Sequence, residues 1–313
     1  MSKYPQVTAF SGDADTIRVV GHRGARGILP ENSMVGFDFA LSIGVDLLEF
    51  DVLLSGDDIP VITHNHEFHG SAVRGADGAF LNGENLRVAS LTMADIERFD
   101  VGRLNVETEY GRRFPDQAQM DGVRVPRLSE LLQLVSQPGY ASACLMLELK
   151  SDPDLAQDSA ERARIVSIVC DEVRRAEMTD RTVLHSFDWA LLAECRRQAP
   201  DMPLSFLTQL QENEHDVGED SSILVTPDFS NPDTSVPDEV SRAGGSLWCP
   251  HFTELDASSL ARARELGLTI AVWTVNELDD IESMIDLRVD AIVTDYPGRV
   301  QQRLSERGFR WRR

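Results

Sequence analysis

Eight short apolar segments rich in β-forming residues recur along the chain, and most of them are separated by segments with helical periodicity. Near-continuous apolar strands that alternate with amphipathic helices are typical of a parallel sheet whose outer face is covered by helices. Eight such units in 313 residues favour a closed (β/α)8 TIM barrel over an open doubly wound sheet. The expected strands are residues 18–24, 46–54, 144–150, 181–187, 203–209, 246–252, 269–275 and 290–297.

The expected helices have apolar residues spaced about 3.6 positions apart, which gives each helix one apolar stripe. They are residues 33–44, 128–135, 159–178, 189–198, 258–267 and 276–287. Gly267 is a typical helix end, and Asn276 is a typical cap before the first turn of a helix. Residues 1–313 are therefore interpreted as a single barrel domain.

A ninth β-rich segment, residues 59–65, breaks the alternation because only SGDD separates it from the second strand. A parallel crossover needs a dozen or more residues, whereas a short polar link joins antiparallel strands. Residues 52–64 are therefore expected to form a hairpin at the top of strand 2. This hairpin would bring His64 back close to Asp51.

Two long segments lack a clear pattern. Residues 66–125 are rich in Gly, Asn and Asp with weak periodicity, and unpatterned segments of this length are typically functional or disordered. In a TIM barrel an insertion after strand 2 lies over the C-terminal face, where active sites are found, so a small inserted subdomain is expected there. Residues 211–240 are acidic and Pro-rich and are expected to form a loop after the fifth strand.

Composition limits the partners and the cellular location. The formal net charge is −22, which argues against nucleic acid or an anionic membrane as a main partner. No segment reaches the roughly 18 apolar residues that a transmembrane helix needs. The first residues lack the apolar region of a secretory signal, and the four cysteines are widely spaced without a CxxC pair. These features predict a cytoplasmic protein with reduced thiols.

Two pairs of polar residues interrupt otherwise apolar strands. Glu49 and Asp51 are two positions apart in LLEFDVLL, and Glu148 and Lys150 repeat this spacing in LMLELK, so each pair faces one side of its strand. Three carboxylates at one barrel mouth could hold a hard divalent cation such as Mg²⁺ or Ca²⁺. The alternative is a buried ion-pair network in which Lys150 neutralises Glu148 or Glu49.

Histidines lie at the end of the first expected strand and at the end of the hairpin. His22 and His64 are each expected to end a strand at the same face of the barrel, although a single histidine is more often structural. Two histidines that converge beside carboxylates and cations favour acid/base catalysis. The weaker candidates are His66, His69, His185 and His251.

Cations and one aromatic residue complete the candidate site. Of the 30 basic residues only two are lysines, so an interior lysine at position 150 suggests a need for its compact ammonium group. Arg23 can bind a phosphate through two parallel hydrogen bonds. Strand alternation predicts that Trp273 and Val275 face the same side, from which the Trp273 indole could line a substrate pocket.

Taken in order, the motifs HRGARGILPENS, LEFDV, IPVITHN, VPRLSELL, LELK, HSF, VWTVN and TDYP resemble those of the glycerophosphodiester phosphodiesterases. The resemblance runs from residue 18 to about residue 300. It implies a barrel with an insertion after strand 2. It also implies hydrolysis of a small-molecule glycerophosphodiester to an alcohol and sn-glycerol 3-phosphate with one divalent cation, Mg²⁺ or Ca²⁺, with Mn²⁺ as a further candidate.

The resemblance also implies roles for individual residues. They are His22 and His64 as the acid/base pair, Glu49, Asp51 and Glu148 as metal ligands, Arg23, Glu31 and Lys150 as phosphate or substrate contacts, and Asn32 as a support of the loop. The chain departs from the family pattern at Asn65, where the family has Asp after the hairpin histidine, and at Arg26, an additional cation without an assigned role.

Two other functions remain open from the sequence. One is a lysophospholipase D or a phospholipase-C-like lyase on the same scaffold. The other is a catalytically silent barrel that binds a phosphorylated ligand, although a binding protein has no need of two converging histidines. The nucleophile, either water or the vicinal glycerol hydroxyl, the head group and the oligomeric state are also left open.

Overall fold

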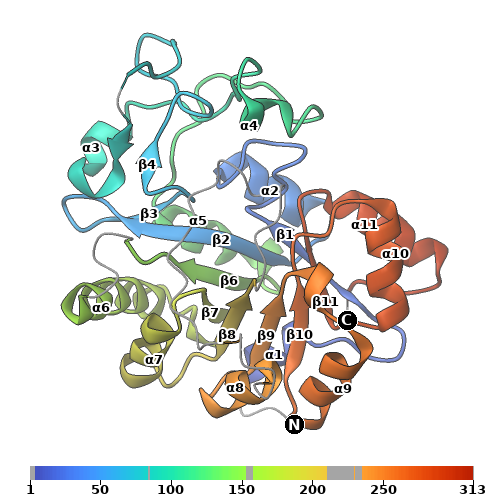
Figure 1. The fold of residues 1–313 in the computed structure, drawn as a ribbon. Helices are drawn as coiled ribbons and strands as arrows, with labels where there is room; N and C mark the ends of the chain where they lie inside the picture. Colours follow the sequence, from blue (N-terminus) through green and yellow to red (C-terminus); the bar gives the residue numbers. More distant parts are fainter. Residues whose placement is uncertain (1–3, 84, 153–157, 210–228, 230–234, 313) are drawn as a thin grey trace.

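A computed structural model describes residues 4–312 except 84, 153–157, 210–228 and 230–234 (Figure 1). Eight parallel strands form a closed barrel, because β1 pairs with both β2 and β11 and every other strand pairs with its chain neighbours. The predicted (β/α)8 TIM barrel is confirmed. The barrel strands are β1 (Arg18–His22), β2 (Leu47–Leu54), β6 (Cys144–Leu149), β7 (Thr182–Ser186), β8 (Leu204–Thr208), β9 (Leu247–Pro250), β10 (Thr269–Val272) and β11 (Ala291–Thr294).

Helices cover the outside of the barrel, as Figure 1 shows. They are α2 (Met34–Ser42), α5 (Leu128–Val135), α6 (Ser159–Arg175), α7 (Trp189–Gln198), α8 (Val236–Arg242), α9 (Ala257–Glu265), α10 (Leu278–Leu287) and α11 (Pro297–Glu306). Single 3-10 turns are η2 (Pro138–Tyr140), η4 (Thr179–Arg181) and η6 (Phe252–Glu254). All six predicted helices are confirmed within a few residues, and α11 was not predicted.

Two details of the helix prediction are wrong. The end of segment 211–240 belongs to helix α8, whose first turn is capped by Ser235 through a hydrogen bond from the Asp238 backbone N–H. The part of that segment before residue 235, apart from Phe229, lies outside the described residues. Helix α10 is preceded by Glu277 rather than capped by Asn276, because the Asn276 side chain is bound to Asp295.

Strand alternation divides the core into two layers. Outward residues of the strands pack with the helices in one large cluster, whereas inward residues such as Val20, Leu47 and Met146 form a separate cluster inside the barrel. Helix α1 (Pro5–Phe10) adds Val7 and Phe10 to the inner cluster. The inner apolar layer therefore fills the lower barrel, and α1 packs against its N-terminal end.

The hairpin after strand 2 is confirmed. Strand β3 (Pro60–Ile62) pairs antiparallel with β2, with Val52 opposite Ile62. The backbone N–H of Thr63 then donates to the Asp51 carbonyl over 3.1 Å. This bond places the next residue, His64, beside the inward face of β2.

Residues 66–125 form small elements at the edge of the barrel near β2 and β3, at the top of Figure 1. The elements are β4 (Glu67–Phe68), β5 (Leu86–Arg87), η1 (Val88–Ser90), α3 (Met93–Ile96) and α4 (Glu109–Arg112). Their apolar side chains share a separate core with residues of the hairpin. None of the helices in the described part of the chain combines the length and apolar composition that crossing a bilayer requires.

Candidate active site

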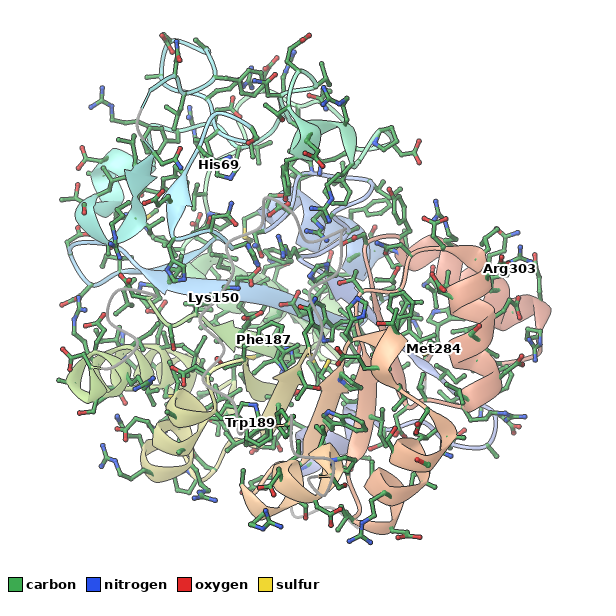
Figure 2. All side chains as sticks on the ribbon, in the orientation of Figure 1. His69, Lys150, Phe187, Trp189, Met284 and Arg303 are labelled. Carbon is green, nitrogen blue, oxygen red and sulfur yellow. The ribbon has the colours of Figure 1, made fainter. Side chains whose placement is uncertain are left out.

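The upper layer of the barrel interior is polar. Glu49 and Asp51 follow Leu47 on the inward face of β2, and Glu148 and Lys150 follow Met146 on or just after β6. The register pairs Asp51 with Glu148 and His22 with Glu49 across neighbouring strands. Figure 2 shows Lys150 at this level, with His69 in the inserted segment above it. The i, i+2 spacing thus places these side chains at one mouth, as predicted.

Glu49, Asp51 and Glu148 form a compact acidic cluster. One carboxylate oxygen from each lies within 4.8 Å of the others, and all three side chains are buried. Burial and the charges of Asp51 and Glu148 raise the pKa of Glu49 well above its usual value. Burial also raises the pKa of Glu148 to about 7. Without a cation, ionisation of these three buried carboxylates together is unfavourable. A hard divalent cation would neutralise their charges, and their converging oxygens fit such an ion.

Two cations lie against the cluster. Lys150 Nζ is 3.2 Å from Glu148 Oε1 and 3.6 Å from Asp51 Oδ1, and Arg23 Nε is 3.4 Å from Asp51 Oδ2. Although burial opposes ionisation, His64, Arg23 and Lys150 lower the pKa of Asp51. The ion-pair network therefore exists together with the acidic cluster. The two interpretations of the sequence are compatible.

A tight loop after β1 attaches the cationic side of the site to the carboxylates. Arg23 and Asn32 have left-handed backbone conformations, with φ of 49° and 50°. The Arg23 backbone N–H donates to Glu49 Oε2 over 3.1 Å, and Asn32 Nδ2 donates to Asp51 Oδ2 over 2.9 Å. Glu31 accepts a hydrogen bond from Arg23 Nη1 over 3.0 Å and another from the Tyr110 hydroxyl.

Gly24 explains why this loop can turn so sharply. Its φ is 88°, and a Cβ at this position would lie 2.9 Å from the backbone carbon of Gly36 in helix α2. Only glycine fits such a contact in this conformation. The glycine therefore lets the chain pass from the end of β1 to α2 without displacing Arg23 from the carboxylates.

His22 is oriented by a carboxylate that the sequence reasoning did not include among the site residues. His22 Nδ1 is 2.7 Å from Asp295 Oδ1, and Nε2 is 3.7 Å from Glu49 Oε2. Burial, with Arg26 next, lowers the pKa of His22. The ring therefore presents Nε2 to the acidic cluster while Asp295 holds the opposite nitrogen.

Asp295 also accepts hydrogen bonds from Arg26 and Asn276. The Arg26 guanidinium donates to both Asp295 oxygens, through Nε over 2.9 Å and Nη2 over 3.1 Å, and Asn276 Nδ2 donates to Oδ2 over 2.7 Å. The Arg26 guanidinium also lies 4.6 Å from the Phe114 ring of the inserted segment. The signals in the sequence were the polar ends of the last two strands, in the motifs VWTVN and TDYP, and the additional cation Arg26.

Replacing Asp295 by Asn should lower the free energy of unfolding by about 3–5 kcal/mol, because a buried guanidinium would lose its carboxylate. Although burial opposes ionisation, Arg26 and His22 lower the pKa of Asp295 below 3.8. This contribution is therefore present above pH 3.8 and is lost as the pH falls below it. Urea unfolding at pH 7 and pH 3 should show a smaller difference between wild type and variant at pH 3. An equal difference at both values would contradict the assignment.

His64 reaches the site from the hairpin. Its ring is close enough for a protonated imidazole to lower the pKa of Asp51, whereas His22 adjoins Glu49. His64 Nδ1 is 2.6 Å from the side-chain oxygen of Asn65. The two histidines therefore approach different carboxylates of the cluster, as expected for residues that serve one reaction centre.

Trp273 lies at the mouth, but the predicted alternation is wrong. Its ring packs against Phe187 and His251, each with a centroid distance of 5.2 Å, and its Nε1 donates to the Cys249 carbonyl over 3.0 Å. Trp273 contacts the inner cluster, whereas Val275 belongs to the outer cluster. The alternation fails because β10 ends at Val272.

The remaining histidines differ in character. His185 lies inside the barrel, where Nδ1 is 2.8 Å from Ser205 Oγ and burial lowers the ring pKa to about 3, which is typical of a neutral structural histidine. His251 is hydrogen bonded to Thr253 beside Trp273. His69 is linked through Asn65 to His64. His66, the first residue of the inserted segment, is buried, and its carbonyl accepts a hydrogen bond from the Val88 backbone N–H over 2.9 Å.

A (β/α)8 barrel whose C-terminal mouth combines buried carboxylates, cations and an oriented histidine defines a barrel enzyme. Residues 22–299 match the model of the glycerophosphoryl diester phosphodiesterase family. The chain therefore belongs to this family.

Individual relatives agree with this assignment. A crystal structure from Silicibacter pomeroyi DSS-3, assigned as a glycerophosphoryl diester phosphodiesterase, is 48% identical with a TM-score of 0.92, and the match covers 98% of this chain and 99% of that one. A glycerophosphodiester phosphodiesterase from Caldanaerobacter subterraneus is 24% identical over 89% of this chain and 94% of its own. An Oleispira antarctica phosphodiesterase, solved with the product sn-glycerol-3-phosphate, shares the fold at 19% identity and a TM-score of 0.70 over 96% and 99% of the two chains.

Proposed function

We propose that this protein hydrolyses glycerophosphodiesters to an alcohol and sn-glycerol 3-phosphate with a divalent cation and two histidines. The observation that carries the proposal is the cluster of Glu49, Asp51 and Glu148 directly beside His22. Membership of the family supports the reaction, and the Oleispira relative binds the proposed product. A silent binding barrel would not explain an oriented histidine beside an acidic cluster.

Glu49, Asp51 and Glu148 would hold the cation, for which Mg²⁺, Ca²⁺ and Mn²⁺ are the candidates. A divalent cation bound there supplies positive charge that polarises a phosphoryl oxygen. Two of these carboxylates also hold the loop after β1 in place. Through Glu49 and Asp51 they fix the backbone of Arg23 and the side chain of Asn32, and thereby the loop that faces the substrate.

Arg23 and Lys150 would bind the phosphoryl oxygens of the diester. Lys150 Nζ is buried beside the acidic cluster, 3.2 Å from Glu148 Oε1 and 3.6 Å from Asp51 Oδ1. An ammonium group has three donors, so it could also bind an anion that approaches from the mouth. Glu31 binds Arg23 Nη1 and would orient the guanidinium or contact a substrate hydroxyl.

His22 and His64 would carry out the two proton transfers. One imidazole accepts the proton of the attacking oxygen, and the other, in its protonated form, donates a proton to the leaving alkoxide. The bond from His22 Nδ1 to Asp295 leaves Nε2 as the nitrogen that faces the reaction centre.

Residues 66–125 would act as a subdomain that closes the substrate site, with Trp273 as part of the opposite wall. Two contacts support this role. Tyr110 binds Glu31, and Gln117 Nε2 donates to the carbonyl of Arg26 over 2.7 Å. A cavity between the mouth and this segment is lined by Glu31, His64 and Tyr110. A cytoplasmic location remains a prediction from the sequence.

The test is a panel of diesters assayed after chelator treatment, with Mg²⁺, Ca²⁺ or Mn²⁺ added back. We expect release of glycerol 3-phosphate from glycerophosphocholine or glycerophosphoethanolamine, with no activity before metal is restored. Preferred cleavage of lysophospholipids, or a cyclic phosphate product, would indicate instead a lysophospholipase D or a lyase. Equal activity with and without metal would rule out a cation at the acidic cluster.

A further inference from the structure

We propose that Asn65 and His69 are positioning residues that hold the His64 ring in a single tautomer. This inference rests on the proposed function, in which His64 transfers a proton. It extends that function because it gives the inserted segment a direct part in preparing the histidine. It also gives a reason for Asn65, where the family has Asp after the hairpin histidine.

Four side chains form a continuous hydrogen-bonded chain that leads away from the reaction centre. His64 Nδ1 is 2.6 Å from Asn65 Oδ1, and Asn65 Nδ2 is 2.6 Å from His69 Nε2. His69 Nδ1 is in turn 2.6 Å from Ser71 Oγ. Distances this short, repeated over three successive contacts, indicate a connected network.

The chemistry of an amide gives this chain a direction. The Asn65 oxygen can only accept a hydrogen bond and its nitrogen can only donate one, whereas a neutral imidazole carries one donor and one acceptor. The Asn65 oxygen therefore requires a proton on His64 Nδ1, which leaves Nε2 as the nitrogen that exchanges the proton of the reaction. At the other end, the Asn65 nitrogen requires His69 Nε2 to be an acceptor.

At the far end of the chain, the Ser71 hydroxyl is compatible with this direction because a hydroxyl can either donate or accept. With Nε2 as an acceptor, His69 carries its proton on Nδ1 and donates it to Ser71 Oγ over 2.6 Å. The backbone N–H of Ser71 is a donor that lies 3.3 Å from the same nitrogen, and only the opposite His69 tautomer could accept it. The direction of the chain is therefore set by Asn65, whose oxygen faces His64 Nδ1 and whose nitrogen faces His69 Nε2.

The inserted segment holds His69 and Ser71 in place. The His69 carbonyl accepts from the backbone N–H of Val73 over 3.1 Å, and the Asn105 backbone N–H donates to the Ser71 carbonyl over 2.8 Å. The Tyr110 ring meets the His69 ring edge-on, with centroids 6.2 Å apart. The orientation of His64 thus depends on the packing of a segment outside the barrel.

An amide and a carboxylate would act differently at position 65. A carboxylate could also accept the His64 Nδ1 proton, but it cannot donate to His69 Nε2. In Asn65→Asp the His64 tautomer should therefore persist while His69 moves its proton to Nε2. In Asn65→Ala His64 loses its Nδ1 contact and His69 loses its Nε2 contact, and His64 should return to the Nε2–H tautomer that free histidine prefers.

The test is nitrogen NMR of ¹⁵N-histidine-labelled protein above the pH at which His64 titrates, with His64 assigned by the loss of its signals in His64→Gln. Wild type and Asn65→Asp should show a protonated Nδ1 and a bare Nε2 on His64, and Asn65→Ala should show the reverse. For diester hydrolysis, kcat should fall about 10–100-fold in Asn65→Ala with little change in KM, and Asn65→Asp should recover most of it.

Asn85→Ala is the matched control, because Asn85 is an exposed residue of the same segment whose side chain donates to the half-buried Glu67 over 3.0 Å. This variant should leave both the tautomer and kcat unchanged. A wild-type His64 with its proton on Nε2 would overturn the proposal without any variant. An unchanged tautomer in Asn65→Ala would also overturn it. If the wild type cleaves no diester, the proposed function fails, while the NMR result still decides the arrangement of the chain.

Discussion

Replacing His22 by alanine is expected to lower kcat for glycerophosphodiester hydrolysis by about 10²–10⁴-fold, the usual contribution of a group that transfers a proton. His22 Nε2 adjoins the acidic cluster at 3.7 Å from Glu49, and its Nδ1 is held 2.7 Å from Asp295 Oδ1. The measurement is initial rate against substrate concentration with saturating metal. Loss of kcat rather than a rise in KM is the expected pattern.

The fold should survive this substitution. Asp295 keeps its hydrogen bonds from Arg26 and Asn276, so the buried charge stays paired. The free energy of unfolding should fall by about 1–3 kcal/mol, the contribution of one hydrogen bond to a charged group. His251→Ala is the matched control, because His251 lies at the same mouth and its Nδ1 is bound to the Thr253 hydroxyl. Full activity of His22→Ala would refute the histidine mechanism.

Replacing Glu49 by glutamine should lower the activity without lowering the free energy of unfolding of the metal-free protein. Burial and two neighbouring carboxylates make the ionised form of Glu49 unfavourable, which is why its pKa is raised. Glutamine removes that charge and keeps an oxygen that can accept the 3.1 Å hydrogen bond from the Arg23 backbone. Without divalent metal, the variant should therefore be at least as stable as wild type, with each kcal/mol gained raising Tm by about 2–4 °C.

With divalent metal present, wild type should become more stable than the Glu49→Gln variant. Wild type should gain stability as Mg²⁺, Ca²⁺ or Mn²⁺ is titrated, because a ligand that binds only the folded state stabilises it. Glu49→Gln should gain less and should lose most of its activity, since one cation ligand is missing. Thermal melts across a metal titration, together with kcat, make the comparison, and Glu265→Gln on the exposed face of α9 is the control. Identical metal responses of wild type and Glu49→Gln would exclude Glu49 as a ligand.

Much of the site could be predicted because it depends on short-range geometry. The i, i+2 spacing of Glu49 and Asp51 places both on one face of any strand, and the burial of Leu47 below them shows that this face is the barrel interior. The hairpin prediction followed from a connection too short for a parallel crossover. It correctly placed His64 next to Asp51 along β2.

The errors arose where regular structure ends. Trp273 lies one residue beyond β10, so strand alternation no longer determined which side it faces. Asn276 is a residue type typical of a helix cap, but its amide is hydrogen bonded to Asp295, and Glu277 occupies the cap position of α10. In both cases a tertiary contact determined the side-chain position.

The sequence by itself determined the barrel, its hairpin and the set of carboxylates and histidines at one mouth, because periodicity and spacing act over a few residues. Only the tertiary structure decided which partner orients each histidine. Asp295 is 273 positions from His22, and the local contacts from His64 to Ser71 are held by longer-range ones such as the Asn105 backbone N–H, which donates to the Ser71 carbonyl. Hydrogen-bond geometry of this kind depends on distances below about 3 Å, which closure of the barrel sets and local sequence patterns do not.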